Sequence, residues 1–301
     1  MATTPRRCWV VLPGGGVKGA WQAGFMRGYF CRPDAPRIDH VYGTSVGAVL
    51  SPLVAARRLD LLEDLTLSIK TATDVFEPWD FVEEHIPMIP LFCHLGIYRR
   101  VSLIDRILGI ARDHLSDEQL EDAFSRCHVV SWDVKNKRET WFTGPDLPFG
   151  MRASSALCLA VPPIEGQGGI FTDGGVAELL PLARLQKDLD ALSPAEREGL
   201  VVLIIDCDQR EIQPLADIPR NPVLFALELV SDGSLLLAHC ETLDWIHTSP
   251  VPVAYIKPSR AFFDNAMDIH PDKIRVAFDD GRSMGEGFEM PDRPPVIPEG
   301  L

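Results

Sequence analysis

Three consecutive glycines, Gly14 to Gly16, stand between the apolar run 8–13 and a segment with the spacing of a helix. Backbone N–H groups at the start of a helix attract negative charge, and glycine leaves them unobstructed. Such a loop can hold a nucleotide phosphate, or it can stabilise the oxyanion that develops during acyl transfer. Gly14, Gly16 and Gly19 also satisfy the G-x-G-x-x-G pattern of dinucleotide-binding proteins. The next segment of the sequence distinguishes between a phosphate site and an oxyanion hole.

The strand expected at 38–45 lacks what a nucleotide site requires. A dinucleotide fold needs an acidic residue at the end of its second strand to bind the ribose. Here Asp39 stands at the beginning of the strand instead. A phosphate-binding Walker loop fails as well, because Ala20 and Trp21 follow Gly19 where Lys and Ser or Thr are required.

The same strand ends in "GTSVG", residues 43–47, which matches the G-x-S-x-G nucleophile elbow. A sharp turn from strand to helix exposes the hydroxyl of Ser45, and Gly43 and Gly47 remove side chains that would collide in the turn. The alternative is a tight turn without a catalytic role. With an elbow at Ser45, the amides of Gly14, Gly15 and Gly16 are expected to form an oxyanion hole.

A nucleophilic serine also needs a base, and no downstream histidine stands in a recognisable loop motif. A carboxylate stands in such a motif. The segment 168–182 contains a short strand that ends in Asp173, followed at once by Gly174 and Gly175. A carboxylate at the end of a strand, with glycines leaving space beside it, is well placed to meet a serine at the end of another strand. The alternative interpretation of Asp173 is an Asx-turn or a helix cap.

With these three motifs in order, the sequence resembles the patatin-like phospholipase family. The family pattern of a G-G-G-x-[KR]-G loop, a G-x-S-x-G elbow and a D-G-[GA] loop is matched at 14–19, 43–47 and 173–175. Two further stretches, 96–108 and 151–175, are similar to family segments, so that the resemblance covers about residues 8 to 182.

The resemblance implies a Ser-Asp dyad in which Asp173 accepts the proton of Ser45 without a histidine, and it implies hydrolysis of a lipid ester with no cofactor and no metal. Lys18 matches the basic position of the glycine loop and would either contact a phosphate headgroup or form a structural ion pair. Two departures from the family pattern, Cys158 and Glu178, concern substrate preference more than activity.

The elements that must position these residues alternate between strands and helices. Short apolar runs rich in β-branched residues predict buried strands, and apolar residues three and four apart predict helices. The strands are expected at 8–13, 127–132 and 200–206, two helices at 45–70, and further helices at 101–115 and 224–246. The alternation indicates an α/β fold with a largely parallel sheet. The resemblance specifies a patatin-like three-layer sandwich related to the α/β-hydrolase architecture, as one catalytic domain over 1–290 with a proline-rich tail at 291–301.

One apolar segment, 74–98, contains three prolines and suits no regular helix. It is expected either to pack on the core or to form an apolar lid or lipid-facing surface. Transient peripheral contact with a membrane is therefore a separate hypothesis.

The composition indicates which binding partners and which cellular compartment to expect. The 301 residues carry 43 acidic and 29 basic side chains, a formal charge of −14, which argues against a nucleic-acid partner. No stretch reaches the ~18 apolar residues of a spanning helix, so a cytoplasmic protein is expected. The seven cysteines are scattered without a C-x-x-C pair and are expected to be buried thiols; neither they nor the histidines have metal-site spacing.

Three functions remain in competition at this level. The leading hypothesis is a serine lipid acyl hydrolase. The second is a lipid- or protein-binding module that retains the fold without catalysis, and the third is a nucleotide-dependent oxidoreductase, which rests on the glycine pattern alone. The sequence does not separate a phospholipase from a triglyceride lipase or a thioesterase, and it does not define the headgroup or the oligomeric state.

Overall fold

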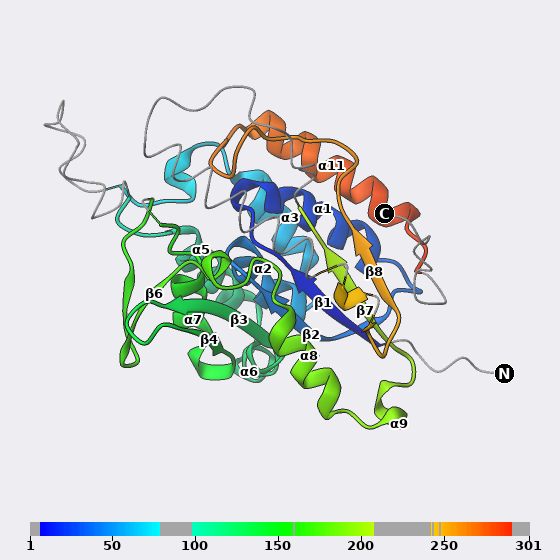
Figure 1. Ribbon diagram of the computed structural model, residues 1–301. Helices are drawn as coiled ribbons and strands as arrows, with labels where there is room; N and C mark the ends of the chain where they lie inside the picture. The colour runs from blue at the N-terminus through cyan, green and yellow to red at the C-terminus, as the bar shows by residue number, and fades with distance from the viewer. Residues whose placement is uncertain are drawn as a thin grey trace, which may run out of the picture.

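A mostly parallel sheet forms the centre of the computed structural model, which describes residues 7–78, 98–158, 160–207, 242, 244–246 and 248–290 (Figure 1). Within these residues the sheet has eight strands in the order β5-β6-β3-β2-β1-β7-β8, and β4 also pairs with β3. The strands are β1 Arg7–Leu12, β2 Arg37–Gly43, β3 Cys127–Asp133, β4 Arg138–Phe142, β5 Ile164–Gly166, β6 Gly169–Thr172, β7 Leu200–Ile205 and β8 Val253–Ile256.

The parallel and antiparallel pairings occupy different parts of the sheet. β1 lies between β2 and β7 and is parallel to both, and β3 and β8 extend this parallel region on either side. The antiparallel pairs join β3 to β4, β3 to β6, and β6 to β5. The largely parallel α/β sheet predicted from the sequence is confirmed.

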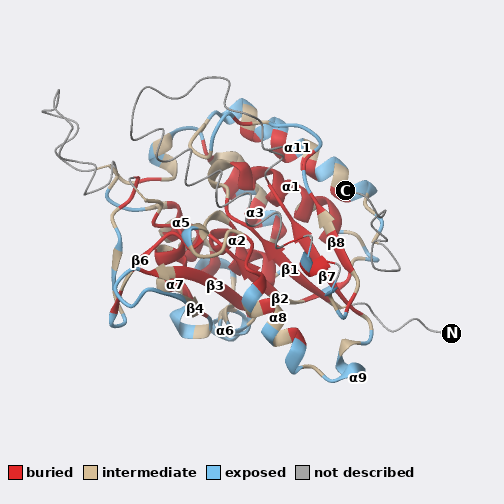
Figure 2. Cartoon of the chain, viewed as in Figure 1, coloured by how far each residue is buried: buried red, intermediate tan, exposed pale blue. Residues whose placement is uncertain are grey.

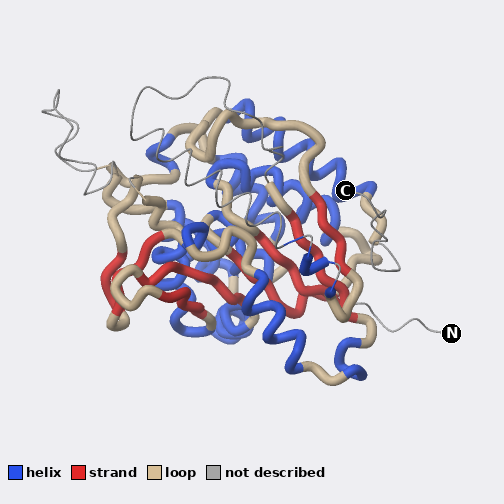
Figure 3. Tube along the Cα trace, viewed as in Figure 1, coloured by secondary structure: helices blue, strands red, loops and turns tan. Residues whose placement is uncertain are grey.

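Helices cover both faces of the sheet, as Figure 3 shows. The α-helices are α1 Gly19–Phe30, α2 Val46–Ala55, α3 Leu59–Ser68, α5 Leu103–His114, α6 Asp117–Ser125, α7 Leu147–Ser154, α8 Leu182–Ala191, α9 Pro194–Arg197 and α11 Pro271–Gly287. Short 3-10 turns are η1 Gly16–Lys18, η2 Ala72–Asp74, η4 Gly144–Asp146 and η5 Gly174–Val176.

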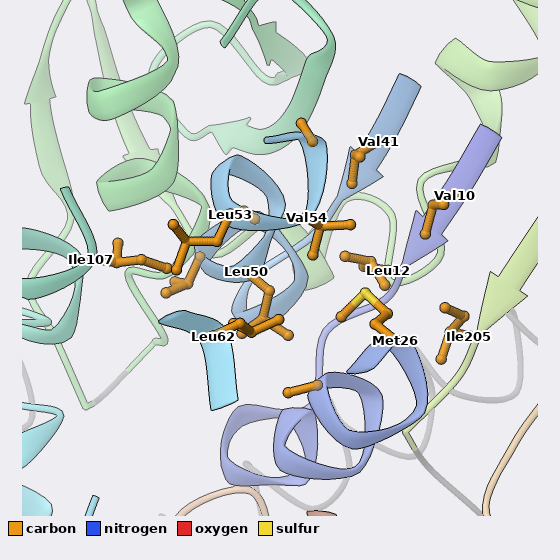
Figure 4. Packing of buried hydrophobic residues seen from close by; sticks show 14 of the residues in the cluster. Val10, Leu12, Met26, Val41, Leu50, Leu53, Val54, Leu62, Ile107 and Ile205 are labelled. Carbon is orange, nitrogen blue, oxygen red and sulfur yellow. The ribbon is translucent and has the colours of Figure 1, made fainter. Parts of the chain in front are cut away.

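Alternation along the strands divides the core into two layers. Val10 and Leu12 of β1 pack into the larger cluster with α1, α2, α3, α5 and α11, part of which is shown in Figure 4. Trp9 and Val11 point to the opposite face and pack with Leu185 of α8. The central strands β1 and β7 are buried along almost their whole length (Figure 2). This is the expected three-layer arrangement, with one layer thicker than the other.

The longest described helix, α11, packs closely against α1 because glycines of each helix meet the backbone of the other. A Cβ atom at Gly24 or Gly28 would lie 2.0 or 2.1 Å from a carbonyl oxygen of α11. A Cβ atom at Gly281 or Gly285 would lie 2.3 Å from a carbonyl oxygen of α1. The two backbones therefore touch directly, and residues close to the chain's end support the helix that follows the glycine loop.

Several expectations can be compared with these elements. The segment 45–70 forms two helices as predicted, and Arg57, with φ +55°, stands between them. The prediction that the cysteines are buried is wrong for Cys31, which is exposed just after α1. Of the other expectations, the tail 291–301 and most of the segments 74–98 and 224–246 lie outside the described residues. No helix among the described residues is both long enough and apolar enough to span a bilayer.

Candidate active site

Ser45 lies in a strained turn between β2 and α2. Its backbone has φ 51° and ψ −117°, a conformation that costs a non-glycine residue about 1–3 kcal/mol and persists only where its surroundings hold it. A Cβ at Gly47 would lie 1.9 Å from the Leu12 carbonyl oxygen, and a Cβ at Gly43 would lie 2.7 Å from the Gly47 carbonyl. Both glycines of the elbow are therefore required by close backbone contacts.

The hydroxyl of Ser45 meets Asp173 across the end of the sheet. Ser45 Oγ donates a hydrogen bond to Asp173 Oδ2 over 2.7 Å, and the N–H of Gly175 donates to Asp173 Oδ1, also over 2.7 Å. The carboxylate is only 4% exposed. Within the described part of the chain, no histidine is hydrogen-bonded to either side chain of this pair.

The buried environment changes the chemistry of Asp173. Burial raises its pKa from the usual 3.8 to about 6, and the hydrogen bonds from Gly175 and Ser45 oppose part of this increase. A carboxylate with a higher pKa is a stronger base, and it is ionised above about pH 6. The pair thus has a nucleophile and a base in direct contact.

The end of α7 and the two residues after it hold both members of the pair in place. Ser154 Oγ accepts the N–H of Ser45 over 2.9 Å, and Ser155 Oγ donates to the Ser45 carbonyl over 3.3 Å. The Ala156 carbonyl accepts the N–H of Asp173 over 2.9 Å. These roles are not predicted from the sequence, although all three residues belong to the R-A-S-S-A stretch 152–156, which lies within the family-like segment 151–175.

The glycine loop runs beside Ser45, since a Cβ at Gly14 would lie 3.1 Å from Ser45 Cβ. The N–H of Gly14 donates to the Leu179 carbonyl over 3.3 Å, so this amide is engaged. The N–H groups of Gly15 and Gly16 have no hydrogen-bond partner among the described residues. The oxyanion hole expected at Gly14, Gly15 and Gly16 therefore stays a prediction that the last two amides support best.

The remaining site residues differ in their surroundings. Lys18 is 6% exposed, so its predicted contact with a headgroup would require the side chain to leave this buried position. A Cβ at Gly174 would lie 2.2 Å from the Val130 carbonyl oxygen. Glu178 accepts the N–H of Leu182 at the start of α8, and Cys158 Sγ lies 3.0 Å from Thr172 Oγ1. Both departures from the family pattern thus have structural contacts beside the site.

An apolar pocket opens at Ser45. It contains about 840 Å³ of space between atoms, including the part open to solvent. Its walls come from η1, α1, α2, α3, α5 and the segment 266–269, and its polar lining residues are Ser45, Thr66 and Ser155. The described residues contain no group of three or more potential metal ligands. The apolar lining of the pocket suits a hydrocarbon chain lying next to the Ser45 hydroxyl.

A mostly parallel α/β sandwich with a serine at a strand-to-helix elbow and a buried carboxylate in contact with it defines a class of serine hydrolase-like folds. Within that class, the sequence profile described as patatin-like phospholipase matches residues 10–185. The chain belongs to the patatin-like phospholipase family, which confirms the resemblance and supports a lipid hydrolase.

Individual relatives are more distant. The chain is 27% identical over 174 residues to an uncharacterized NTE family protein of Mycobacterium tuberculosis, covering 58% of this chain and 44% of that protein. It is also 27% identical over 177 residues to lysophospholipase nte1 of Neurospora crassa, covering 59% of this chain and 11% of that protein. The matched part therefore spans less than half the length of these relatives.

A solved structure supports the fold independently. VipD from Legionella pneumophila aligns with a TM-score of 0.51 at 13% sequence identity, covering 94% of this chain and 66% of that chain. A coverage of 94% means that the alignment extends well past residue 185, where the match to the family profile ends.

Proposed function

We propose that this chain hydrolyses carboxylic esters of phospholipids or related lipids through an acyl-enzyme on Ser45. The observation that carries the proposal is the 2.7 Å hydrogen bond from Ser45 Oγ to the buried carboxylate of Asp173 at the mouth of an apolar pocket. Family membership supports the same substrate class.

In the first half of the reaction, Asp173 takes the proton of Ser45 as the serine oxygen attacks the ester carbonyl. The negative charge moves to the carbonyl oxygen, where the N–H groups of Gly15 and Gly16 stabilise it. When the intermediate collapses, protonated Asp173 returns the proton to the alcohol or lysolipid that leaves. The acyl group then remains bonded to Ser45.

In the second half, Asp173 removes a proton from a water molecule, which attacks the acyl-enzyme. The tetrahedral intermediate again places its charge at the glycine loop. Its collapse releases a fatty acid and returns the proton to Ser45. The apolar pocket holds the acyl chain through both halves, because burial of each methylene contributes about 0.8 kcal/mol.

Fatty-acid release from mixed phospholipid vesicles and from short-chain nitrophenyl esters tests this proposal. Ser45→Ala and Asp173→Asn should each reduce release by about 10³-fold or more. Ser125→Ala and Asp190→Asn, exposed residues of the same types, serve as controls and should keep wild-type rates. Release that persists in both dyad variants, with circular dichroism of folded protein, would contradict the mechanism. Absence of release from every substrate would favour the non-catalytic binding module.

Transient membrane contact is part of the proposal, because the substrate is expected to reside in a bilayer or micelle. The hypothesis concerns Trp79, Phe81 and Phe92, which lie outside the described residues. Co-sedimentation with vesicles should fall when all three are replaced by Ala. Equal binding by the wild type and this variant would exclude a role for the segment.

A further inference from the structure

Two buried side chains that are far apart in the sequence, Gln22 and Cys207, hold the glycine loop. Gln22 of α1 is fully buried, and its Nε2 donates to the carbonyl of Pro13 over 3.2 Å and to the carbonyl of Ile205 over 2.9 Å. These carbonyls stand where the chain leaves β1 and at the end of β7. Gln22 therefore connects the start of the glycine loop to the neighbouring strand.

The unpaired amide oxygen of Gln22 indicates that the two hydrogen bonds donated by its Nε2 are the reason for an amide at this position. Gln22 Oε1 is buried without a hydrogen-bond partner among the described residues. Leaving a buried polar atom unpaired costs about 1–3 kcal/mol, whereas an apolar side chain of similar shape would avoid the penalty. A residue placed only to fill the core would not need an amide here.

Cys207, two residues beyond β7, contacts the next peptide of the loop. Its thiol donates to the carbonyl of Gly14 over 3.4 Å, and the residue is 5% exposed. The sulfur also fills the position that a side chain on Gly15 would need, since a Cβ there would lie 2.3 Å from Cys207 Sγ. The sulfur thus packs directly against the Gly14–Gly15 peptide.

The contacts hold successive peptide groups of the loop. The Pro13 carbonyl is held by Gln22, the Gly14 N–H by the Leu179 carbonyl, and the Gly14 carbonyl by Cys207. The described residues contain no cis peptide bonds, and in a trans peptide the C=O and the N–H point in opposite directions. The contact between the Gly14 carbonyl and Cys207 therefore directs the Gly15 N–H away from Cys207.

We propose that Cys207 and Gln22 are positioning residues of the oxyanion hole, which orient the Gly15 N–H for the charge that develops at Ser45. The inference rests on the proposed function and adds two residues that the family motifs do not contain. Without the thiol, the Gly14–Gly15 peptide can rotate and the N–H loses its orientation. Loss of one oxyanion donor lowers kcat by about 10² to 10³, so a partial loss of orientation should lower it by about tenfold or more.

The test uses the rate at which a long-chain fluorophosphonate labels Ser45, followed by intact-protein mass spectrometry, together with ester hydrolysis. In labelling, the Ser45 oxygen bonds to phosphorus, fluoride leaves, and the serine proton passes to Asp173. The phosphoryl oxygen gains charge in the same place as the ester oxyanion. Labelling therefore reports on the hole without requiring the natural lipid to be known.

Cys207→Ala and Gln22→Leu should each lower the labelling rate and kcat by about tenfold or more while KM changes little. Cys207→Ser retains a hydroxyl donor and should recover most of the rate. Cys8→Ala removes a buried thiol near the opposite end of β1 and should behave as the wild type, which controls for the loss of packing. Melting curves verify that each variant is folded.

The outcomes distinguish the positioning role of Cys207 and Gln22 from the proposed hydrolysis by Ser45. Wild-type labelling rates in Cys207→Ala and Gln22→Leu would overturn the positioning role and leave the dyad intact. Equal losses in Cys207→Ser and Cys207→Ala would overturn the hydrogen-bonding role of the thiol. If Ser45 of the wild-type protein is not labelled at all, the proposed function itself fails, and the inference fails with it.

Discussion

The glycine loop, Gly14–Gly19, and the aspartate loop, Asp173–Gly175, are both glycine-rich segments that follow strands and meet at Ser45. Their glycines have different roles. In the glycine loop, the missing side chains of Gly15 and Gly16 are replaced in space by Cys207 Sγ and the Ala266 carbonyl oxygen. The packing of the glycine loop therefore requires residues without a Cβ atom at these two positions.

In the aspartate loop, only Gly174 lacks the space for a side chain. Gly174 faces the Val130 carbonyl oxygen, where a Cβ would lie at 2.2 Å. A Cβ at Gly175 would lie 3.1 Å from Asp173 Oδ1, somewhat tighter than an ordinary contact, and 3.4 Å from Leu179 Cδ1, an ordinary contact distance. Gly175 contributes its N–H, a group that nearly every residue has. Similar glycine patterns thus reflect a lack of space for a side chain in one loop and a hydrogen-bond donor in the other.

Gly16→Ala should displace the glycine loop and lower activity strongly. The new Cβ would lie 2.2 Å from the Ala266 carbonyl oxygen, and the residue has φ +58°. We expect a loss of about 10²-fold or more in kcat, because one oxyanion donor moves. Steady-state hydrolysis measures this loss. Near-normal kcat in a folded variant would show that the position of Gly16 is not critical.

Asp173→Asn should stabilise the folded protein at pH 8 while abolishing hydrolysis. The folded state binds the Asp173 proton more tightly than the unfolded state, because the pKa rises from 3.8 to about 6. Stability therefore falls as pH rises from about 4 to 6, and above pH 6 the charged carboxylate costs about 3 kcal/mol. Asparagine has no such charge. Urea unfolding should show the advantage at pH 8 and its disappearance below about pH 4.

The pH profile should report the aspartate loop alone, because backbone amides of the glycine loop do not titrate in this range. Asp173 must be ionised to act as the base, so kcat/KM should fall about tenfold for each pH unit below about 6. Initial rates with a non-ionising ester check this slope. A flat profile down to pH 4.5, with intact protein, would argue against Asp173 as the base.

Gly175→Ala should sharpen the comparison with the smallest effect. The substitution keeps the N–H that donates to Asp173 and adds a methyl group 3.1 Å from Asp173 Oδ1, a contact only slightly tighter than usual. Activity should stay within about threefold of wild type, since a shift of a few tenths of an ångström suffices to accommodate the methyl group. The same ester assay applies. A loss as large as that of Gly16→Ala would mean that the two loops do not differ as described.

The parts of the site that are local in sequence could be predicted from it. The elbow around Ser45 and the loop at Asp173 each combine their residue types within five positions, and the buried runs that became β1, β3 and β7 are continuous and apolar. The antiparallel strand β4 was missed because its residues are mostly half-exposed and form no apolar run.

Contacts between distant segments could not be predicted in the same way. The engagement of the Gly14 amide by Leu179, and the roles of Gln22 and Cys207, depend on which strand ends become neighbours in space. The exposure of Cys31 was missed for a related reason: the buried helix α1 ends at Phe30, and the next residue already faces solvent. Sequence motifs identified the reacting groups, whereas long-range packing determines how they are held.

The contact between α1 and α11 also bears on how the chain folds during synthesis. Trp21 and Asp280, which are hydrogen-bonded across this contact, are 259 positions apart. At about 5–20 residues per second, a ribosome needs about 10–50 s to make the intervening chain. Throughout that interval α1 lacks its partner helix, and Val17 lacks the Ala266 carbonyl that fixes the glycine loop. Ser45 is therefore translated long before the residues that complete the contacts of the glycine loop.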